Sequence, residues 1–121
     1  MIKAMADETR LRILNILKEG EMCVCEIETI LDVNQSNASR HLNKLSNAGI
    51  IEYKKAAKYV YYKINDDILC EYPFVSEIIK CHTAKLEQCM IDIERLGKYK
   101  AAGLTCDDIS NGKLKKAGGL L

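Results

Sequence analysis

The sequence has little of what membrane and secreted proteins need. No run of apolar residues approaches the roughly 18–20 that span a bilayer. The first ten residues carry Asp7, Glu8 and Arg10 where a signal peptide would need an apolar stretch. The absence of both features predicts a cytoplasmic protein that has no membrane partner. Separately, there are only two histidines, too few for a histidine-rich zinc site.

The sequence also lacks the residue groups that catalysis needs. It offers no Ser/His/Asp arrangement and no pair of carboxylates placed for acid–base work. A small thiol oxidoreductase that uses Cys23 and Cys25 is the enzymatic alternative, but the βαβ context of a thioredoxin-like site is missing. We therefore expect no enzyme and no catalytic cofactor.

The size and the cysteine count point to one reduced domain. A chain of 121 residues forms a single domain with a modest core, which a dimer would extend. Six cysteines are about 5% of the chain, below the roughly 8–10% of disulfide scaffolds. In a reducing compartment such thiols are buried, metal-binding or redox-active rather than structural bridges.

Positive charge is concentrated in the middle of the chain. The net charge of the whole chain is +1, but residues 35–64 hold six Lys/Arg against Glu52 alone, while residues 1–34 and 65–97 are acidic. A basic block between acidic flanks predicts a surface that binds a polyanion. The alternative is an ordinary solvated charged surface.

Hydrophobic spacing predicts a helix-turn-helix in the first half of the chain. Residues 4–18 form an amphipathic pattern that Gly20 ends, and residues 22–31 form a second, short helix. Asp32 to Asn34 make the turn. Asn34 caps a third helix over residues 35–47, which Gly49 ends.

A wing follows the third helix. Residues 50–55 and 58–64 alternate as two strands around Ala56 and Ala57. Because this turn lacks the glycine or asparagine of tight hairpins, we expect a looser loop. The fold class is therefore mainly α: a winged helix-turn-helix with a two-stranded wing and a long C-terminal dimerisation helix.

That dimerisation helix is expected over residues 73–97, with Pro73 in its first turn. Its apolar positions follow alternating spacings of four and three, typical of a coiled-coil seam. A seam with no second helix to receive it predicts a homodimer. The expected interface residues are Val75, Ile79, His82, Leu86, Cys89 and Ile93, with Leu96 continuing the seam. Residues 1–97 would form the DNA-binding and dimerisation domain, and residues 98–121 a loosely attached tail.

Several of these stretches resemble the ArsR/SmtB family of winged-helix metal-sensing repressors. They are the opening Asp7 to Leu14, the stretch Glu21 to Ile27, Ser39-Arg40-His41-Leu42 followed by Gly49, and Tyr61 to Ile64. They cover about half of the chain in the family's order. The resemblance implies a homodimer that binds double-stranded operator DNA near its own promoter and releases it when a ligand binds.

Cys23-Val24-Cys25 resembles the element of the family's arsenic-responsive branch, which implies As(III) or Sb(III) as the inducer. Thiolates suit such soft ions. Residues two apart on a regular helix point about 200° apart, so we expect chelation to distort the helix and misplace its neighbour. A position near a helix N-terminus would lower the pKa of both thiols.

The alternatives are two core cysteines, or a redox or reactive-sulfur sensor of the same fold. Many arsenic sensors have a third cysteine where this chain has Glu28. The third ligand could be Cys106, or Cys70 or Cys81. The family's zinc-sensing branch would have only His82 and Cys81 for its site on the long helix. We expect His82 and Cys89 to be interface and core residues instead.

The expected DNA contacts come from the third helix and the wing. Amide and guanidinium groups read base edges, and hydroxyl and ammonium groups contact phosphates. Asn37 and Arg40 are the expected base readers, and His41 either positions the helix or touches phosphate. The full set is Gln35, Ser36, Asn37, Ser39, Arg40, His41 and Lys44 on the helix, with Lys54, Lys55, Lys58 and Tyr59 on the wing.

Overall fold

The N-terminal part of the chain forms two helices rather than one. The structure, a computed structural model, describes residues 2–103. Helix α1 covers Ile2–Met5 and α2 covers Glu8–Leu17, so the single helix expected over residues 4–18 is wrong. Asp7 separates them, because its backbone is extended at φ −154° and its Oδ1 accepts the backbone N–H of Arg10 at 3.1 Å. A side-chain cap of this kind begins a new helix.

The helix-turn-helix is confirmed. Helix α3 covers Val24–Leu31 and α4 covers Gln35–Asn47. Asn34 caps α4 through its Oδ1, which accepts the backbone N–H of Asn37 at 2.8 Å. Gly49 follows α4 with φ +79°, a conformation that glycine adopts without strain. The apolar face of α4 is fully buried and consists of Ala38, Leu42 and Leu45.

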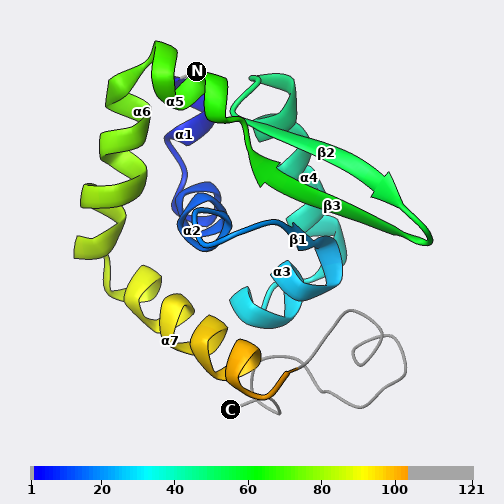
Figure 1. Cartoon of the computed structure of the whole chain (residues 1–121). Helices are drawn as coiled ribbons and strands as arrows, with labels where there is room; N and C mark the ends of the chain where they lie inside the picture. The colour runs from blue at the N-terminus through cyan, green and yellow to red at the C-terminus, as the bar shows by residue number, and fades with distance from the viewer. Residues whose placement is uncertain (1, 104–121) are drawn as a thin grey trace.

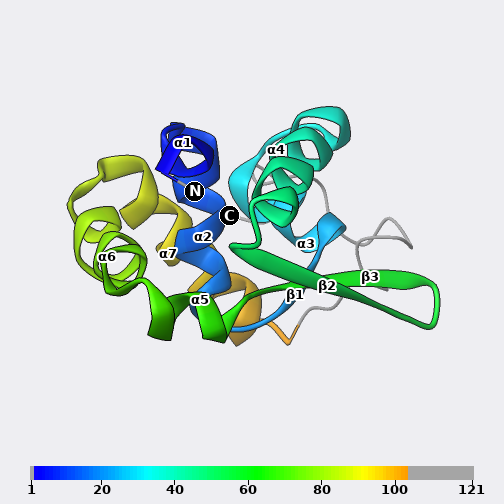
Figure 2. The same ribbon diagram turned by 90° about the horizontal axis from the view of Figure 1, so that it is seen from above.

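The wing is a hairpin with a third, short strand beside it. Strands β2 (Ile51–Ala56) and β3 (Tyr59–Ile64) pair antiparallel, with Ala56 opposite Tyr59. The connection is thus a tight two-residue turn, not the expected looser loop, and Ala57 takes the left-handed conformation at φ +55°. Strand β1 (Met22–Cys23) pairs antiparallel with β3, giving the order β1-β3-β2. The hairpin projects from the body of the molecule (Figure 2).

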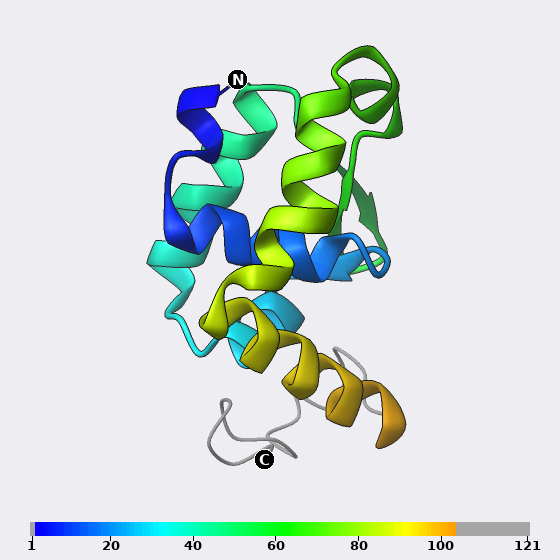
Figure 3. The same ribbon diagram turned by 90° about the vertical axis from the view of Figure 1, so that its left-hand side faces the viewer.

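The C-terminal half is not one continuous helix. Helices α5 (Asp66–Glu71) and α6 (Pro73–Glu77) lead into a π-helical turn at Ile78–His82 and a 3-10 turn at Thr83–Lys85. Leu86 is then extended at φ −88° and ψ 124°, and α7 covers Glu87–Ala101. The expected helix over residues 73–97 is therefore interrupted at Leu86, where the chain changes direction (Figure 3).

The core forms around α2, which α4, α6 and α7 surround (Figure 1). Val75, Ile79 and Cys89 of the expected dimer seam are at most 1% exposed, because they pack into the chain's own core. Their use in a dimer interface would need a different conformation. Among the other seam residues, His82 and Leu86 are exposed and Ile93 is half-buried. Within residues 2–103, no helix is long and apolar enough to cross a membrane.

The tail begins later than expected. Helix α7 continues through Ala101, so residues 98–101 belong to the folded body. Tyr99 is 3% exposed and packs in the core cluster. An aromatic ring buried at this position fixes the end of α7 against the domain.

Candidate DNA-binding and thiol site

The outer face of α4 carries the polar residues expected to contact DNA. Gln35, Ser36, Arg40 and Lys44 are exposed, and Asn37 and Ser39 are half-buried. All six lie on one helix whose opposite face is the buried Ala38-Leu42-Leu45 stripe. This arrangement suits a helix that enters the major groove with its N-terminal residues foremost.

Asn37 and Arg40 are hydrogen-bonded to each other. The Nη2 of Arg40 donates to the Oδ1 of Asn37 at 2.7 Å. The bond joins side chains one helical turn apart and limits the directions in which the guanidinium can point. The guanidinium is thereby held in place before any base contact forms.

His41 lies on the inner face of α4. It is only 4% exposed, and its Nδ1 is 3.8 Å from a carboxylate oxygen of Asp7, the residue that caps α2. Burial lowers the pKa of His41, and although Asp7 opposes this, Arg40, Arg10 and Lys44 add to it. This placement favours the expected role of positioning α4 against α2 over the alternative of a phosphate contact.

The wing lysines differ in their surroundings. The Nζ of Lys54 lies 3.4 Å from a carboxylate oxygen of Glu21, and that of Lys63 lies 3.3 Å from Glu52. Lys58 stacks over the ring of Tyr59, with its Nζ 5.4 Å from the ring centroid. Lys55 is exposed near the tip of β2. The hairpin thus presents cations along its length, as a DNA-backbone contact requires.

The two cysteines of the Cys-Val-Cys element are already close together. Their Sγ atoms lie 3.5 Å apart. The expected opposite orientation is wrong because Cys23 is not helical: it ends β1, has φ −82° and ψ 164°, and precedes the first turn of α3. Two thiolates bound about 2.3 Å from one tetrahedral ion lie about 3.8 Å apart. The pair therefore has nearly the spacing that chelation needs.

The surroundings of the pair disfavour the charged form of the thiol. Burial raises the pKa of Cys25, and the carboxylates of Glu28 and Glu26 raise it further, so the expected lowering is wrong. Cys25 is a free thiol, whereas Cys23 is fully buried and is disulfide-bonded in this structure, so the expectation of unbridged thiols is wrong for Cys23. A soft ion can therefore bind the pair only after a reductant has cleaved this disulfide, and it must then displace the proton of Cys25 and reach a covered Cys23.

A third ligand is not found within residues 2–103. No group of three His, Cys, Asp or Glu side chains in that range is placed to hold a metal ion. Cys70 and Cys81 are exposed free thiols, and Cys89 is buried as expected. The remaining candidate, Cys106, lies outside the described residues.

The sequence did not predict the contacts that hold Cys23 in place. Its backbone N–H donates to Oε1 of Glu26 at 3.1 Å. The second oxygen of Glu26 accepts the hydroxyl of Tyr99 at 2.6 Å, so α7 touches the start of α3. A glutamate three residues after the N-cap was visible as half of a capping box, but its partner 73 residues away was not.

A second unpredicted contact joins α7 to α2 and to the end of α3. The Nε and Nη2 of Arg12 donate to both oxygens of Asp92, at 2.8 and 3.0 Å. The Nη2 of Arg12 also donates to the backbone carbonyl of Leu31 at 2.8 Å, just before the turn into α4. Burial opposes the charge on Arg12, but the hydrogen bond and charge of Asp92 outweigh it and raise the pKa of the guanidinium.

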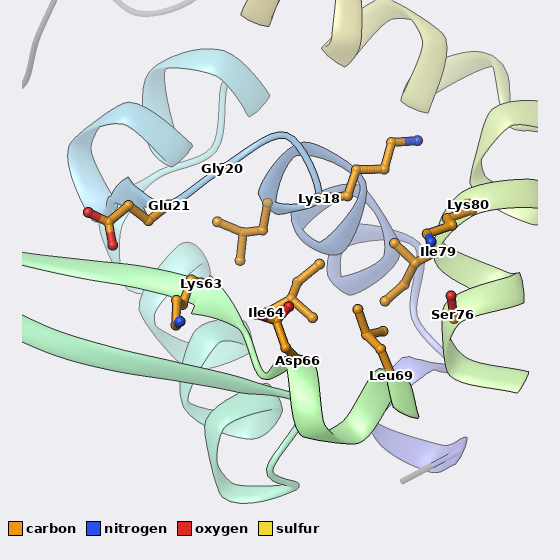
Figure 4. Close-up of a pocket in the computed structure, with 11 residues that line it drawn as sticks. Lys18, Gly20, Glu21, Lys63, Ile64, Asp66, Leu69, Ser76, Ile79 and Lys80 are labelled. Carbon is orange, nitrogen blue, oxygen red and sulfur yellow. The ribbon is translucent and has the colours of Figure 1, made fainter. Parts of the chain in front are cut away.

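A pocket of about 240 Å³ lies at the base of the wing (Figure 4). Its inner wall is apolar and includes Ile64, Leu69 and Ile79, and lysine and acidic side chains stand around it. None of the described residues that line it is a cysteine or histidine. The pocket therefore shares no residue with the thiol pair, and its lining offers no sulfur or imidazole ligand to a soft ion.

The fold and the polar face of α4 define a winged helix-turn-helix DNA-binding protein. The family model for bacterial regulatory proteins of the arsR family matches residues 7–53. The arsenical resistance operon repressor of Escherichia coli K12 is 35% identical over 97 residues, which cover 78% of this chain and 83% of that repressor. The chain belongs to the arsR family of transcriptional regulators.

Two further relatives extend this comparison. A cadmium resistance transcriptional regulatory protein CadC homolog of Staphylococcus aureus is 43% identical over 68 residues, 55% of this chain and 56% of that protein. The chain thus spans little more than half of that relative's length. A homodimeric winged helix-turn-helix DNA-binding domain from Mycobacterium bovis superimposes with a TM-score of 0.56 at 32% identity, covering 63% of this chain and 71% of that domain.

Proposed function

We propose that this protein is a homodimeric repressor that releases its operator when trivalent arsenic or antimony binds Cys23 and Cys25. One observation supports this most directly. The two sulfur atoms lie 3.5 Å apart on the residues that join β1 to α3. Soft thiolate ligands suit such ions. A third thiol would complete the site, and Cys106 is the candidate.

The position of Cys23 gives the site a route to both DNA-contacting elements. Cys23 is paired with Tyr61 of β3, a strand of the wing. It also precedes the first turn of α3, which packs against α4. Because Cys23 is fully buried and disulfide-bonded in this structure, an ion can bind it only once the disulfide is reduced and this junction moves. Such a movement shifts the wing and the recognition helix together, which lowers operator affinity.

The names of relatives agree with a thiophilic inducer. The Escherichia coli relative is an arsenical resistance operon repressor, and the Staphylococcus aureus relative is a cadmium resistance regulator. The homodimeric state of the Mycobacterium bovis domain likewise agrees with a dimer here. Our proposal assumes that this chain shares both properties, the thiophilic inducer and the homodimeric state.

The test is a titration of the fully reduced protein bound to fluorescent DNA from upstream of its own gene. Arsenite and zinc are added separately, and release is followed by fluorescence anisotropy. We expect release by near-stoichiometric arsenite and none by zinc at the same concentration. Release only after oxidant or persulfide is added would contradict the proposed inducer and favour a redox sensor of the same fold.

Arg40→Ala should abolish the preference for the operator while the protein remains folded. A guanidinium that reads a base edge contributes about 1–3 kcal/mol of discrimination, or roughly 5- to 150-fold in affinity. Arg40 is exposed and held by Asn37, so its removal leaves the core unchanged. Anisotropy with operator and scrambled duplexes measures the ratio of the two affinities.

Lys55→Ala is the matched control for Arg40→Ala. Lys55 is an exposed wing cation, and as a phosphate contact it should weaken both duplexes about equally. An operator preference that survives Arg40→Ala, or one that disappears with Lys55→Ala, would contradict these assignments.

The dimer is expected to use the exposed apolar side chains around the start of α7. Leu86 is 37% exposed, Met90 53% and Ile91 37%. Clustered apolar side chains of this kind mark association surfaces. Leu86→Glu should weaken the dimer at least tenfold in sedimentation equilibrium. Tyr53→Glu, on the wing and 65% exposed, is the control that should leave the dimer unchanged.

A further inference from the structure

We infer that Tyr99 of α7 is a positioning residue which, through Glu26, holds Cys23 in the closed, DNA-binding arrangement and opposes ligand binding there. This inference concerns the regulation of the proposed thiol site and therefore rests on the proposed function. The contact between α7 and the first turn of α3 then contributes part of the free energy by which ligand binding opposes DNA binding.

Glu26 stands between two donors that come from different parts of the chain. One oxygen accepts the backbone N–H of Cys23 at 3.1 Å, and the other accepts the hydroxyl of Tyr99 at 2.6 Å. Tyr99 is 3% exposed, so its ring cannot follow Glu26 if the carboxylate moves. A short hydrogen bond from a buried hydroxyl to a carboxylate is among the stronger kinds in proteins.

The held position is incompatible with an ion reaching both sulfur atoms. Cys23 is 0% exposed while the backbone of residue 23 is tied to Glu26. To uncover Cys23, the first turn of α3 must move relative to α7, and this movement breaks the bond between Tyr99 and Glu26. The bond therefore exists in the DNA-binding form and is lost in the ligand-bound form.

Helix α7 is held in place by its own contacts, so the first turn of α3 would move while α7 stays where it is. Arg12 of α2 binds both oxygens of Asp92, which is 0% exposed. The Nη1 of Arg95 donates to the carbonyl of Ile30 at 3.4 Å. With α7 anchored to α2 and to the C-terminal end of α3, a movement of the first turn of α3 is opposed by the Tyr99 contact.

Linkage fixes the direction of the expected effects. An interaction present only in the DNA-binding form stabilises that form, so its removal tightens ligand binding and weakens operator binding to the extent that the other form becomes populated. A general loss of folding would weaken both. The opposite signs therefore distinguish a positioning role from a merely structural one.

The experiment compares wild type, Tyr99→Phe and Tyr72→Phe as full-length reduced proteins. Phenylalanine keeps the buried ring and removes only the hydroxyl, and Tyr72 is a 41% exposed control. Operator affinity without ligand is measured by anisotropy, and arsenite affinity without DNA by calorimetry. For Tyr99→Phe we expect roughly tenfold or more tighter arsenite binding, from the strength of a hydrogen bond to a charged group, together with weaker operator binding. Tyr72→Phe should match wild type.

Glu26→Gln completes the set, because glutamine can accept from Cys23 and can still bond to Tyr99. It should retain more operator affinity than Glu26→Ala. Equal affinities of Tyr99→Phe and wild type, or a parallel loss of both affinities, would overturn the inference. If wild type bound no arsenite, the proposed inducer would fail. The operator affinity of Tyr99→Phe would still decide whether this contact holds the DNA-binding form.

Discussion

Cys25→Ser is expected to bind the operator nearly as well as wild type and to remain bound in arsenite. Cys25 is half-buried in the first turn of α3, and serine retains its size closely enough to preserve that turn. The hydroxyl cannot replace a thiolate for a soft ion. Because the loss of a residue that merely supports a metal ligand already costs about 10- to 100-fold in metal affinity, we expect roughly 100-fold more arsenite to be needed for release.

The matched control for Cys25→Ser is Cys70→Ser, which removes an exposed free thiol on α5. Anisotropy titrations of both variants with arsenite measure the midpoint of release. A wild-type midpoint for Cys25→Ser, or a loss of response in Cys70→Ser, would move the sensing site away from the Cys-Val-Cys element. Cys23→Ser is less informative, because Cys23 is fully buried and its replacement also affects the core.

Asp92→Asn is expected to cause the largest loss of stability of any single change to a charged residue described here. Asp92 is 0% exposed and binds Arg12 through both oxygens. Removal of one partner from a buried ion pair leaves the other charge uncompensated and costs about 3–5 kcal/mol. The free energy of unfolding of a small domain is only about 5–15 kcal/mol in total. Urea unfolding followed by circular dichroism measures the change.

The control lies two residues further along the same helix. Glu94 pairs with Lys98 at 3.8 Å, but both side chains are largely exposed. Glu94→Gln should therefore change the free energy of unfolding by less than about 1 kcal/mol. Replacement of both Arg12 and Asp92 by apolar residues of similar size should restore much of the stability lost in Asp92→Asn. Equal effects of Asp92→Asn and Glu94→Gln would show that the buried pair carries no special weight.

Local signals predicted the helix-turn-helix accurately. The asparagine cap at Asn34 and the glycine at Gly49 both act within a few residues of the helix ends they define. The bounds of α4 therefore followed from the sequence. The outer face of α4 followed as well, because a buried stripe fixes which side chains point to solvent.

Features that depend on distant residues were missed. The apolar spacing of the C-terminal half continues across Leu86, so periodicity alone could not reveal the break there. The non-helical backbone of Cys23 comes from pairing with Tyr61 in β3. That pairing reversed the expected geometry of the two thiols. The contacts of Arg12 with Asp92 and of Tyr99 with Glu26 join residues 80 and 73 positions apart.

The ion pairs along the wing affect how DNA binding responds to salt. A lysine that meets a phosphate normally adds to the release of cations condensed on the duplex, about 0.9 per neutralised phosphate. Lys54 and Lys63 already have Glu21 and Glu52 as internal counterions. If these lysines turn to phosphates, two carboxylates are left to attract cations from the solvent. We therefore expect the ionic-strength dependence of operator binding to report fewer phosphate contacts than the wing would make.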